Sequence, residues 1–154
     1  MKAELMTEQG APEVLQLTEL PEPEITDPGQ LKVRLHAAGI NPIDTKLRSR
    51  GVLFDNAYPV VLGSDGAGEI VEVGNAVTDF APGDRVWFCH GGLGREQGNY
   101  AEYKVIPAEE VALMPESLDF VQAAAAPLVL ITAWEGLYER ARIKAGQDVL
   151  IHAG

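Results

Sequence analysis

The stretch LKVRLHA, residues 31–37, alternates apolar and polar side chains, and this alternation predicts the fold class. Successive side chains of a strand point to opposite faces of a sheet, so a period of two indicates one buried face and one solvent-facing face. Weaker strand candidates precede it at Lys2–Met6 and Val14–Glu19. The strand pattern returns between residues 67 and 107. We therefore expect a mainly β fold with short helices.

In that later region, short apolar runs are separated by turn residues. The runs 70–73, 85–88 and 100–106 are predicted strands, and Pro82-Gly83-Asp84 is a predicted turn. His90–Gly98 has four glycines in nine residues and is expected to form a loop.

A short helix is predicted after Asn41-Pro42. Asparagine is a favoured N-cap, and proline at the first helical position loses no N–H that the helix needs. The helix should run to about Arg50 and end at Gly51.

The pattern becomes helical again after about residue 115. Ser117 is expected to cap a helix over Asp119–Ala125, and Pro127 to open a second helix that ends at Gly146. Asp148–His152 is then a predicted strand. A strand followed by Ala-Gly is how a β-α-β unit begins, so we expect the chain to be the front part of a longer protein.

Length, composition and charge exclude several classes of protein. The 154 residues suit one main domain, and the 12 Lys and Arg against 23 Asp and Glu give a net charge of −11. So acidic a chain disfavours nucleic acid and anionic membrane as partners. The longest apolar run, Ala123–Trp134, is shorter than the roughly 20 residues of a membrane span. With one cysteine and no leader-like start, a cytoplasmic location is expected.

Five segments in order resemble the medium-chain dehydrogenase/reductase superfamily. They are AAGINPID (37–44), PVVLGSDGAG (59–68), PGDRV (82–86), GNYAEY (98–103) and the segment 123–134. The resemblance implies that residues 1–125 form a GroES-like, partly open β-barrel on the substrate side of a cleft. It implies that residues 126–154 are an inter-domain helix and the first strand of a Rossmann cofactor domain.

The zinc-dependent members of the superfamily have a cysteine where this chain has Asn41, and His-Glu where it has Ser64-Asp65. Their remaining ligand comes from the region 122–132, which here contains no Cys, His, Asp or Glu. A catalytic zinc needs three such ligands, and the structural zinc lobe needs four cysteines, of which only Cys89 is present. We therefore expect neither zinc site.

Without zinc, the chain resembles the quinone oxidoreductase (zeta-crystallin-like) branch. That resemblance implies hydride transfer from NADPH to a quinone or an α,β-unsaturated carbonyl. NADPH would be bound mainly by the part of the protein beyond Gly154, and the parent protein would be a homodimer. A stand-alone GroES-like binding or oligomerisation module is the alternative.

Five residues are candidates for the site, and each has a structural alternative. Asn41 is predicted to line the nicotinamide end of the cleft, in a catalytic and cofactor-binding role, and it is also a plain helix N-cap. Asp44 is a catalytic candidate and a capping-box partner of Asn41. Thr132 is predicted to approach the nicotinamide carboxamide, although threonine in a helix often bonds back to a carbonyl. Tyr58 and Ser64 are predicted substrate contacts. The structural alternative for Tyr58 is an aromatic residue in the core or at its rim, and for Ser64 it is a turn residue.

Two neighbouring residues complete the set. Cys89 has no acid–base partners at motif spacing, so a small buried hydrophobic role is expected. His90, in the glycine-rich loop, is the histidine with a possible substrate role.

Overall fold

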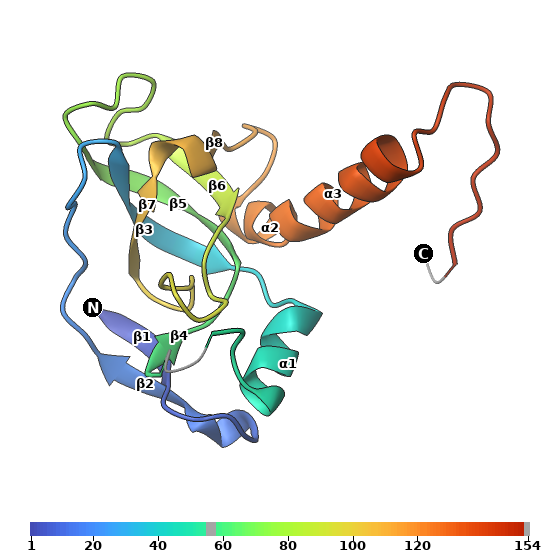
Figure 1. Cartoon of the computed structure of the whole chain (residues 1–154). Coiled ribbons are helices and arrows are strands. Elements are labelled where there is room, and N and C mark those ends of the chain that lie inside the picture. The colour runs from blue at the N-terminus through green and yellow to red at the C-terminus, as the bar shows by residue number, and fades with distance from the viewer. Residues whose placement is uncertain (55–57, 153–154) are drawn as a thin grey trace.

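The computed structural model describes residues 1–54 and 58–152 and is mainly β with short helices, as predicted (Figure 1). The strands are β1 (Lys2–Met6), β2 (Leu15–Glu19), β3 (Gln30–Ala38), β4 (Val60–Val61), β5 (Asp65–Val73), β6 (Arg85–Cys89), β7 (Tyr103–Pro107) and β8 (Ala112–Leu113). The helices are α1 (Pro42–Arg50), α2 (Phe120–Ala124) and α3 (Pro127–Trp134), with 3-10 turns at Pro12–Val14 and Ala108–Glu110 and a π-helical turn at Glu135–Arg140.

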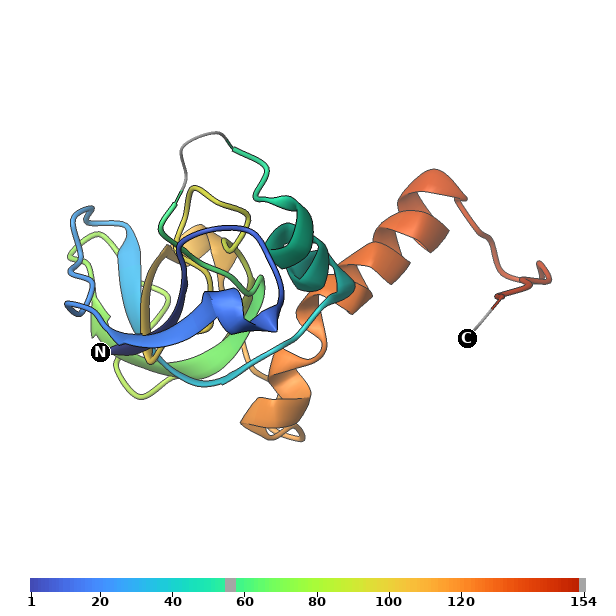
Figure 2. The ribbon, with the colours of Figure 1, turned by 90° about the horizontal axis from the view of Figure 1, so that it is seen from below.

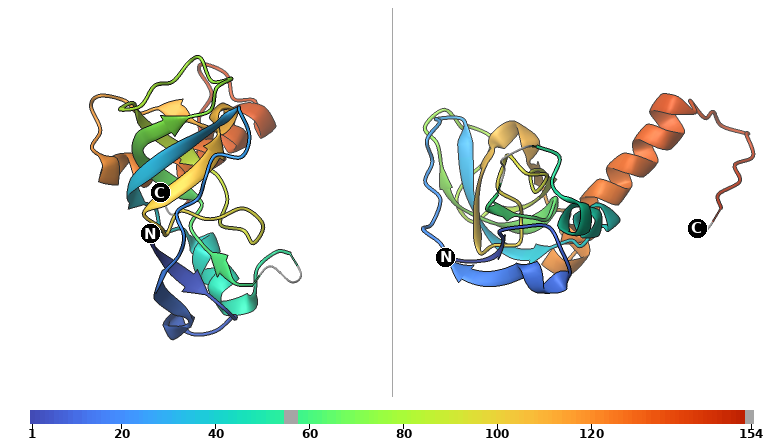
Figure 3. Two further views of the ribbon diagram at one scale, coloured as in Figure 1. Left: turned by 90° about the vertical axis from the view of Figure 1, so that its left-hand side faces the viewer. Right: turned by 60° about the horizontal axis from the view of Figure 1, so that its bottom comes forward.

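The strands form two open, antiparallel sheets. One sheet has five strands in the order β7-β3-β5-β6-β8, and the other has three in the order β2-β1-β4. Figure 3 shows the two sheets side by side, with α1 next to the smaller one. Neither sheet closes on itself within residues 1–54 and 58–152, which agrees with the partly open barrel implied by the resemblance.

The core of the larger sheet follows the alternation seen in the sequence. Leu31 and Val33 of β3 are fully buried, whereas Lys32 and Arg34 lie on the other face. The buried cluster is completed by Ile70, Val86, Phe88 and Ile106 from the three neighbouring strands. Burial of these side chains supplies the hydrophobic free energy that holds the sheet against the segments carrying Val77, Phe80 and Val111.

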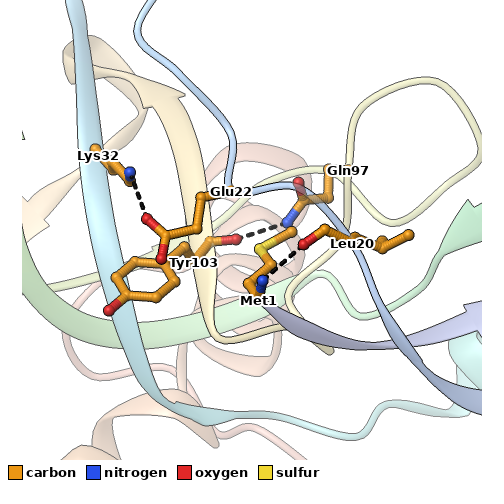
Figure 4. Close-up of polar contacts among 6 residues, drawn as sticks. All are labelled: Met1, Leu20, Glu22, Lys32, Gln97 and Tyr103. Carbon is orange, nitrogen blue, oxygen red and sulfur yellow. Dashed lines mark hydrogen bonds and ion pairs between the residues drawn. The ribbon is translucent and has the colours of Figure 1, made fainter.

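The N-terminal strands are fastened by polar contacts shown in Figure 4. The amino group of Met1 donates to the Leu20 carbonyl oxygen at 2.6 Å. The Lys32 ammonium pairs with Glu22 at 2.9 Å, which ties the segment after β2 to β3. These contacts keep the first strands against the body of the fold.

Two helix boundaries differ from the prediction. The N-cap of α2 is Asp119, not Ser117, because the Asp119 carboxylate accepts the Gln122 N–H at 2.8 Å. The second helix does not reach Gly146. It changes to π-helical geometry after Trp134 and ends before Arg142, whose φ of 51° is left-handed.

The predicted strand at residues 148–152 is wrong for this structure. No strand lies beside this segment within the described residues, and a strand needs a neighbour to accept its hydrogen bonds. Leu150 is 80% exposed. Figure 2 shows this segment beyond α3, away from both sheets. Within the described part of the chain, no helix has the length and apolar character needed to cross a bilayer.

Candidate functional site

The beginning of α1 is held by two buried polar residues. Asn41 is the N-cap, with an extended backbone, and Pro42 opens the helix as predicted. The Asp44 carboxylate accepts the Asn41 main-chain N–H at 2.7 Å and the Tyr100 hydroxyl at 2.9 Å. Asp44 therefore fixes the backbone of Asn41 in the way that its capping-box spacing indicates.

Asp65, the first residue of β5, is fully buried and connects three elements. One carboxylate oxygen, Oδ2, accepts the side-chain amide of Asn41 at 2.9 Å. The other, Oδ1, accepts the main-chain N–H of Leu128, in the first turn of α3, at 3.0 Å. The start of α1, the start of α3 and the start of β5 therefore meet at one carboxylate.

Burial and the two neighbouring carboxyl groups, Asp44 and Asp65, dominate the electrostatics of the site. Burial raises the pKa of Asp44, and the nearby charge of Asp65 raises it further, against the lowering effect of the hydrogen bonds from Asn41 and Tyr100. Burial and the charge of Asp65 also raise the pKa of the Cys89 thiol to about 12. Cys89 is therefore a thiol and not a thiolate at neutral pH, which disfavours a nucleophilic role.

Thr132 lies on α3 one turn after Leu128. Its hydroxyl donates to the Leu128 carbonyl oxygen at 2.7 Å, the bond expected from the structural alternative. The side chain is exposed, and the hydroxyl oxygen keeps its capacity to accept a hydrogen bond.

Tyr58 and Ser64, the two predicted substrate contacts, lie in different surroundings. The Tyr58 ring packs against a buried cluster that includes Met6 and Leu47, and its hydroxyl is buried with no hydrogen-bond partner among the described residues. Ser64 is buried, and its carbonyl oxygen accepts the His90 N–H at 2.8 Å. Ser64 therefore lies next to the buried carboxylate of Asp65, whereas the Tyr58 hydroxyl lies near Gly51, at the other end of α1 from Asn41.

A groove of about 360 Å³ lies between β6 and α3, and we name it the β6–α3 groove. It is lined by Trp87, Phe88, Cys89, Glu109, Glu110, Val111, Ala112, Pro127, Leu130 and Ile131. None of the five predicted site residues lines it. Cys89 connects the groove to Asp65, its cross-strand neighbour on β5.

The sequence reasoning missed the central position of Asp65 and the role of Lys104. An aspartate within the apolar and glycine-rich run 59–68 could have signalled a buried, hydrogen-bonded carboxylate. Lys104 is buried, and its ammonium donates to the carbonyl oxygens of His90 at 2.7 Å and Gln97 at 2.6 Å. Burial lowers the pKa of Lys104 to about 7. Lys104 thus holds both ends of the glycine-rich loop.

Comparisons with known proteins agree with this fold. Residues 27–116 match the family model of the alcohol dehydrogenase GroES-like domain. The chain is 38% identical to the quinone oxidoreductase of Mus musculus over 152 residues, which cover 99% of this chain and 45% of that protein. The chain therefore spans less than half the length of such curated relatives.

Solved structures give the same result. The quinone oxidoreductase from Coxiella burnetii superposes with a TM-score of 0.89 at 36% identity, covering 99% of this chain and 49% of that one. The Escherichia coli quinone oxidoreductase complexed with NADPH superposes with a TM-score of 0.82 at 33% identity, covering 94% of this chain and 42% of that one.

Proposed function

The chain belongs to the medium-chain dehydrogenase/reductase superfamily, in its quinone oxidoreductase branch, and we propose that it is the substrate side of an NADPH-dependent, zinc-free oxidoreductase. The acceptor of hydride would be a quinone or an α,β-unsaturated carbonyl. Residues 1–125 would form the substrate domain and residues 126–154 the start of the cofactor domain. The observation that carries this proposal is the hydrogen-bonded contact of Asn41, Asp65 and Leu128.

This contact supports a reaction without zinc. Asn41 and Ser64-Asp65 stand at the positions that carry ligands in the zinc-dependent members. In this chain Asn41 and Leu128 both present N–H donors to Asp65, and an N–H donor cannot bind a cation. Among residues 1–54 and 58–152, no group of three or more His, Cys, Asp or Glu side chains is placed to hold a metal ion.

The β6–α3 groove can accept only one end of a nicotinamide dinucleotide. Its lining is mainly apolar and includes Glu109 and Glu110, with no lysine or arginine. Such a surface suits a flat ring and repels phosphate groups. We propose that the phosphates are bound outside this chain, and that the nicotinamide lies beside Asn41 and Thr132, which do not line this groove. The isolated 154-residue chain should therefore bind NADPH weakly or not at all.

Asn41 and Thr132 retain hydrogen-bonding capacity for such a ligand. The Asn41 amide nitrogen has two hydrogens and gives one to Asp65, which leaves the second for a substrate carbonyl or the cofactor ribose. The Thr132 hydroxyl donates its hydrogen to the Leu128 carbonyl oxygen. The hydroxyl oxygen can therefore accept a hydrogen bond from the nicotinamide carboxamide. Reduced nicotinamide supplies the hydride when bound, and these residues orient the reacting groups.

The remaining candidates have more indirect proposed roles. For Asp44, the contacts with Asn41 and Tyr100 favour holding the start of α1 over direct proton transfer. Tyr58 and Ser64 would border the substrate. A homodimeric parent protein and a reducing, cytoplasmic location complete the proposal, the latter because Cys89 is a free thiol.

The test uses the complete protein that contains this chain, incubated with NADPH and either 1,4-benzoquinone or cyclohexenone. We expect NADPH oxidation that requires the acceptor and no stoichiometric zinc by elemental analysis. Asn41→Ala should lower kcat/KM about 10- to 100-fold, since a buried donor to the reacting groups is lost. Asn75→Ala, an exposed turn residue, is the matched control and should have no effect.

Two results would contradict the proposal. One is the absence of NADPH oxidation with every quinone and enone tried, which would favour the alternative of a binding or oligomerisation module. The other is one equivalent of zinc per chain that survives chelation and is needed for activity.

A further inference from the structure

Asn41 and Thr132, the two proposed cofactor-binding residues, come from separate elements and are joined by a single chain of hydrogen bonds. The Asn41 side-chain amide donates to Asp65 Oδ2 at 2.9 Å, and the Leu128 N–H donates to Asp65 Oδ1 at 3.0 Å. The Leu128 carbonyl oxygen in turn accepts the Thr132 hydroxyl at 2.7 Å. Asp65 is the one ionisable group in this chain of contacts.

The burial of Asp65 makes these two bonds necessary. A carboxylate taken out of water is costly unless hydrogen bonds replace its hydration. Asp65 is fully buried, and neither of the two groups bonded to its carboxylate oxygens is a cation. Its preference for this geometry is therefore strong, because either donor moving away would leave a buried oxygen unsatisfied.

The surroundings leave the Asp65 side chain little freedom. A Cβ at Gly39 would lie 2.9 Å from the Asp65 Cβ and would overlap the Ala124 carbonyl oxygen. The Gly39 N–H donates to the Asp65 carbonyl oxygen at 3.1 Å, so the backbone is held as well. The absence of a side chain at Gly39 thus lets the segment before α1 and the end of α2 close around Asp65.

We infer that Asp65 is a positioning residue that sets the place of the Asn41 amide relative to the turn of α3 carrying Thr132. This inference rests on the proposed function for what those two residues bind. Asp65 acts through Asn41 and Leu128 and needs no contact with the ligand itself. It stands where zinc-dependent members carry a residue of the His-Glu pair, so in this chain a carboxylate organises the site in place of an ion.

The first test is made on the 154-residue chain with Asp65→Asn. The amide has the same shape, but it can accept only one of the two hydrogen bonds and presents its own N–H to the other donor. We expect hydrogen exchange of the Leu128 amide to quicken by about 10-fold or more and the Asn41 side-chain amide signal to shift in NMR spectra. Asp84→Asn is the matched control, since Asp84 also accepts a main-chain N–H, from Ala81, but in a surface turn.

The wild-type chain provides a second measurement that does not depend on the variant folding. Main-chain N–H groups in the first turn of a helix have no intrahelical acceptor and normally exchange fast. The Leu128 amide should instead be protected, because it bonds a buried carboxylate. Fast exchange of Leu128 in the wild-type chain would overturn the inference.

The third measurement is a double-mutant cycle on the complete protein. Asp65→Asn should lower kcat about 10-fold while the Kd for NADPH changes less than about 2-fold, because the phosphates are bound elsewhere. Combined with Asn41→Ala, it should cost less than the sum of the two single effects, since both changes remove the contact between Asn41 and Asp65. A purely stabilising role for Asp65 would lower the folded fraction and leave kcat of the folded protein unchanged.

The outcomes separate this inference from the proposed function. Unchanged Leu128 exchange and Asn41 signals in Asp65→Asn would overturn the inference, whatever the activity. Strictly additive effects of the two substitutions on kcat would do the same. Changed NMR signals together with a wild-type protein inert toward NADPH, quinones and enones would overturn the proposed function while supporting the positional role of Asp65.

Discussion

Residues 1–125 and residues 126–152 contain similar apolar side chains but place them very differently. In the first region, Ile70, Val86 and Ile106 are fully buried between strands that pair edge to edge. In the second, Ile131 is 54% exposed and Ile151 is 65% exposed. Figure 1 shows why: α3 leads away from the sheets, and the segment that follows it to residue 152 stays apart from them. Apolar composition therefore indicates a capacity for burial, and neighbouring elements decide whether burial occurs.

The same contrast holds for polar groups. In residues 1–125 the buried side chains Asp65 and Lys104 each have two hydrogen-bond partners. In residues 126–152 the ion pair of Arg140 with Glu135 lies at the surface, where solvent screens it. Substitutions should thus change the free energy of unfolding strongly in the first region and weakly in the second.

The largest expected difference is between two isoleucines. Ile70→Ala, in the centre of the core cluster, should lower the free energy of unfolding by about 2–5 kcal/mol, because it removes buried methyl groups and leaves a cavity. Ile131→Ala should change it by less than about 0.5 kcal/mol, because the side chain is half exposed. Urea unfolding of the two variants measures both values. An equal loss of unfolding free energy in the two variants would show that α3 is packed more tightly than its exposure indicates.

Alanine substitution of two glycines should change the free energy of unfolding in opposite directions. A Cβ at Gly68 in β5 would overlap the Arg34 carbonyl oxygen of β3, so Gly68→Ala should cost about 1–3 kcal/mol through strain between the strands. Among residues 1–54 and 58–152, nothing lies within 4 Å of a Cβ built at Gly136. Gly136→Ala should stabilise the helical segment by about 0.5–1 kcal/mol, since alanine loses less backbone entropy than glycine. Thermal unfolding of both variants would test this, and destabilisation by Gly136→Ala would contradict it.

The smallest expected effect is a pH dependence carried by Lys104. Burial lowers its pKa to about 7 in the folded chain, from about 10.5 when unfolded, so between these values the unfolded state binds more protons. The free energy of unfolding should therefore rise with pH above 7, by at most about 1.4 kcal/mol per pH unit.

The measurement runs from pH 7 to 8, because the Cys89 thiol and the Tyr100 hydroxyl, whose pKa values are raised in the folded chain, lower stability once the pH approaches their ordinary values of 9.0 and 10.0. Lys104→Met should remove the rise, and Lys144→Met, at an exposed position, should leave it unchanged. A wild-type slope equal to that of Lys104→Met would show that Lys104 keeps its ordinary pKa.

Local sequence signals predicted most of residues 1–125. The alternation at residues 31–37 corresponds to β3, and Asn41-Pro42 and Gly51 bound α1 as expected. Such signals work because side-chain alternation, N-capping and helix termination depend on residues close together in the chain. The same kind of reasoning placed the cap of α2 at Ser117, although Asp119 has Gln122 three residues later, the capping-box spacing that the structure uses.

The prediction was weakest after residue 126, where structure depends on neighbours. Asp148–His152 has the composition of a buried strand, but the part of the chain that the structure describes places no strand beside it to accept its hydrogen bonds. The site shows the same limit. Asn41 was predicted as a site residue from its sequence context, whereas the importance of Asp65 depends on partners 24 and 63 residues away in the chain.

The sequence by itself determined the mainly β fold and the start of α1, since each depends on residue identity or on spacing over a few positions. Only the tertiary structure decided that Asn41 and Leu128 meet at Asp65 and that Lys104 is buried beneath the glycine-rich loop. The physical reason is that the cost of burying a charge is offset only by donors or acceptors brought from distant elements, and their meeting is a property of the folded chain.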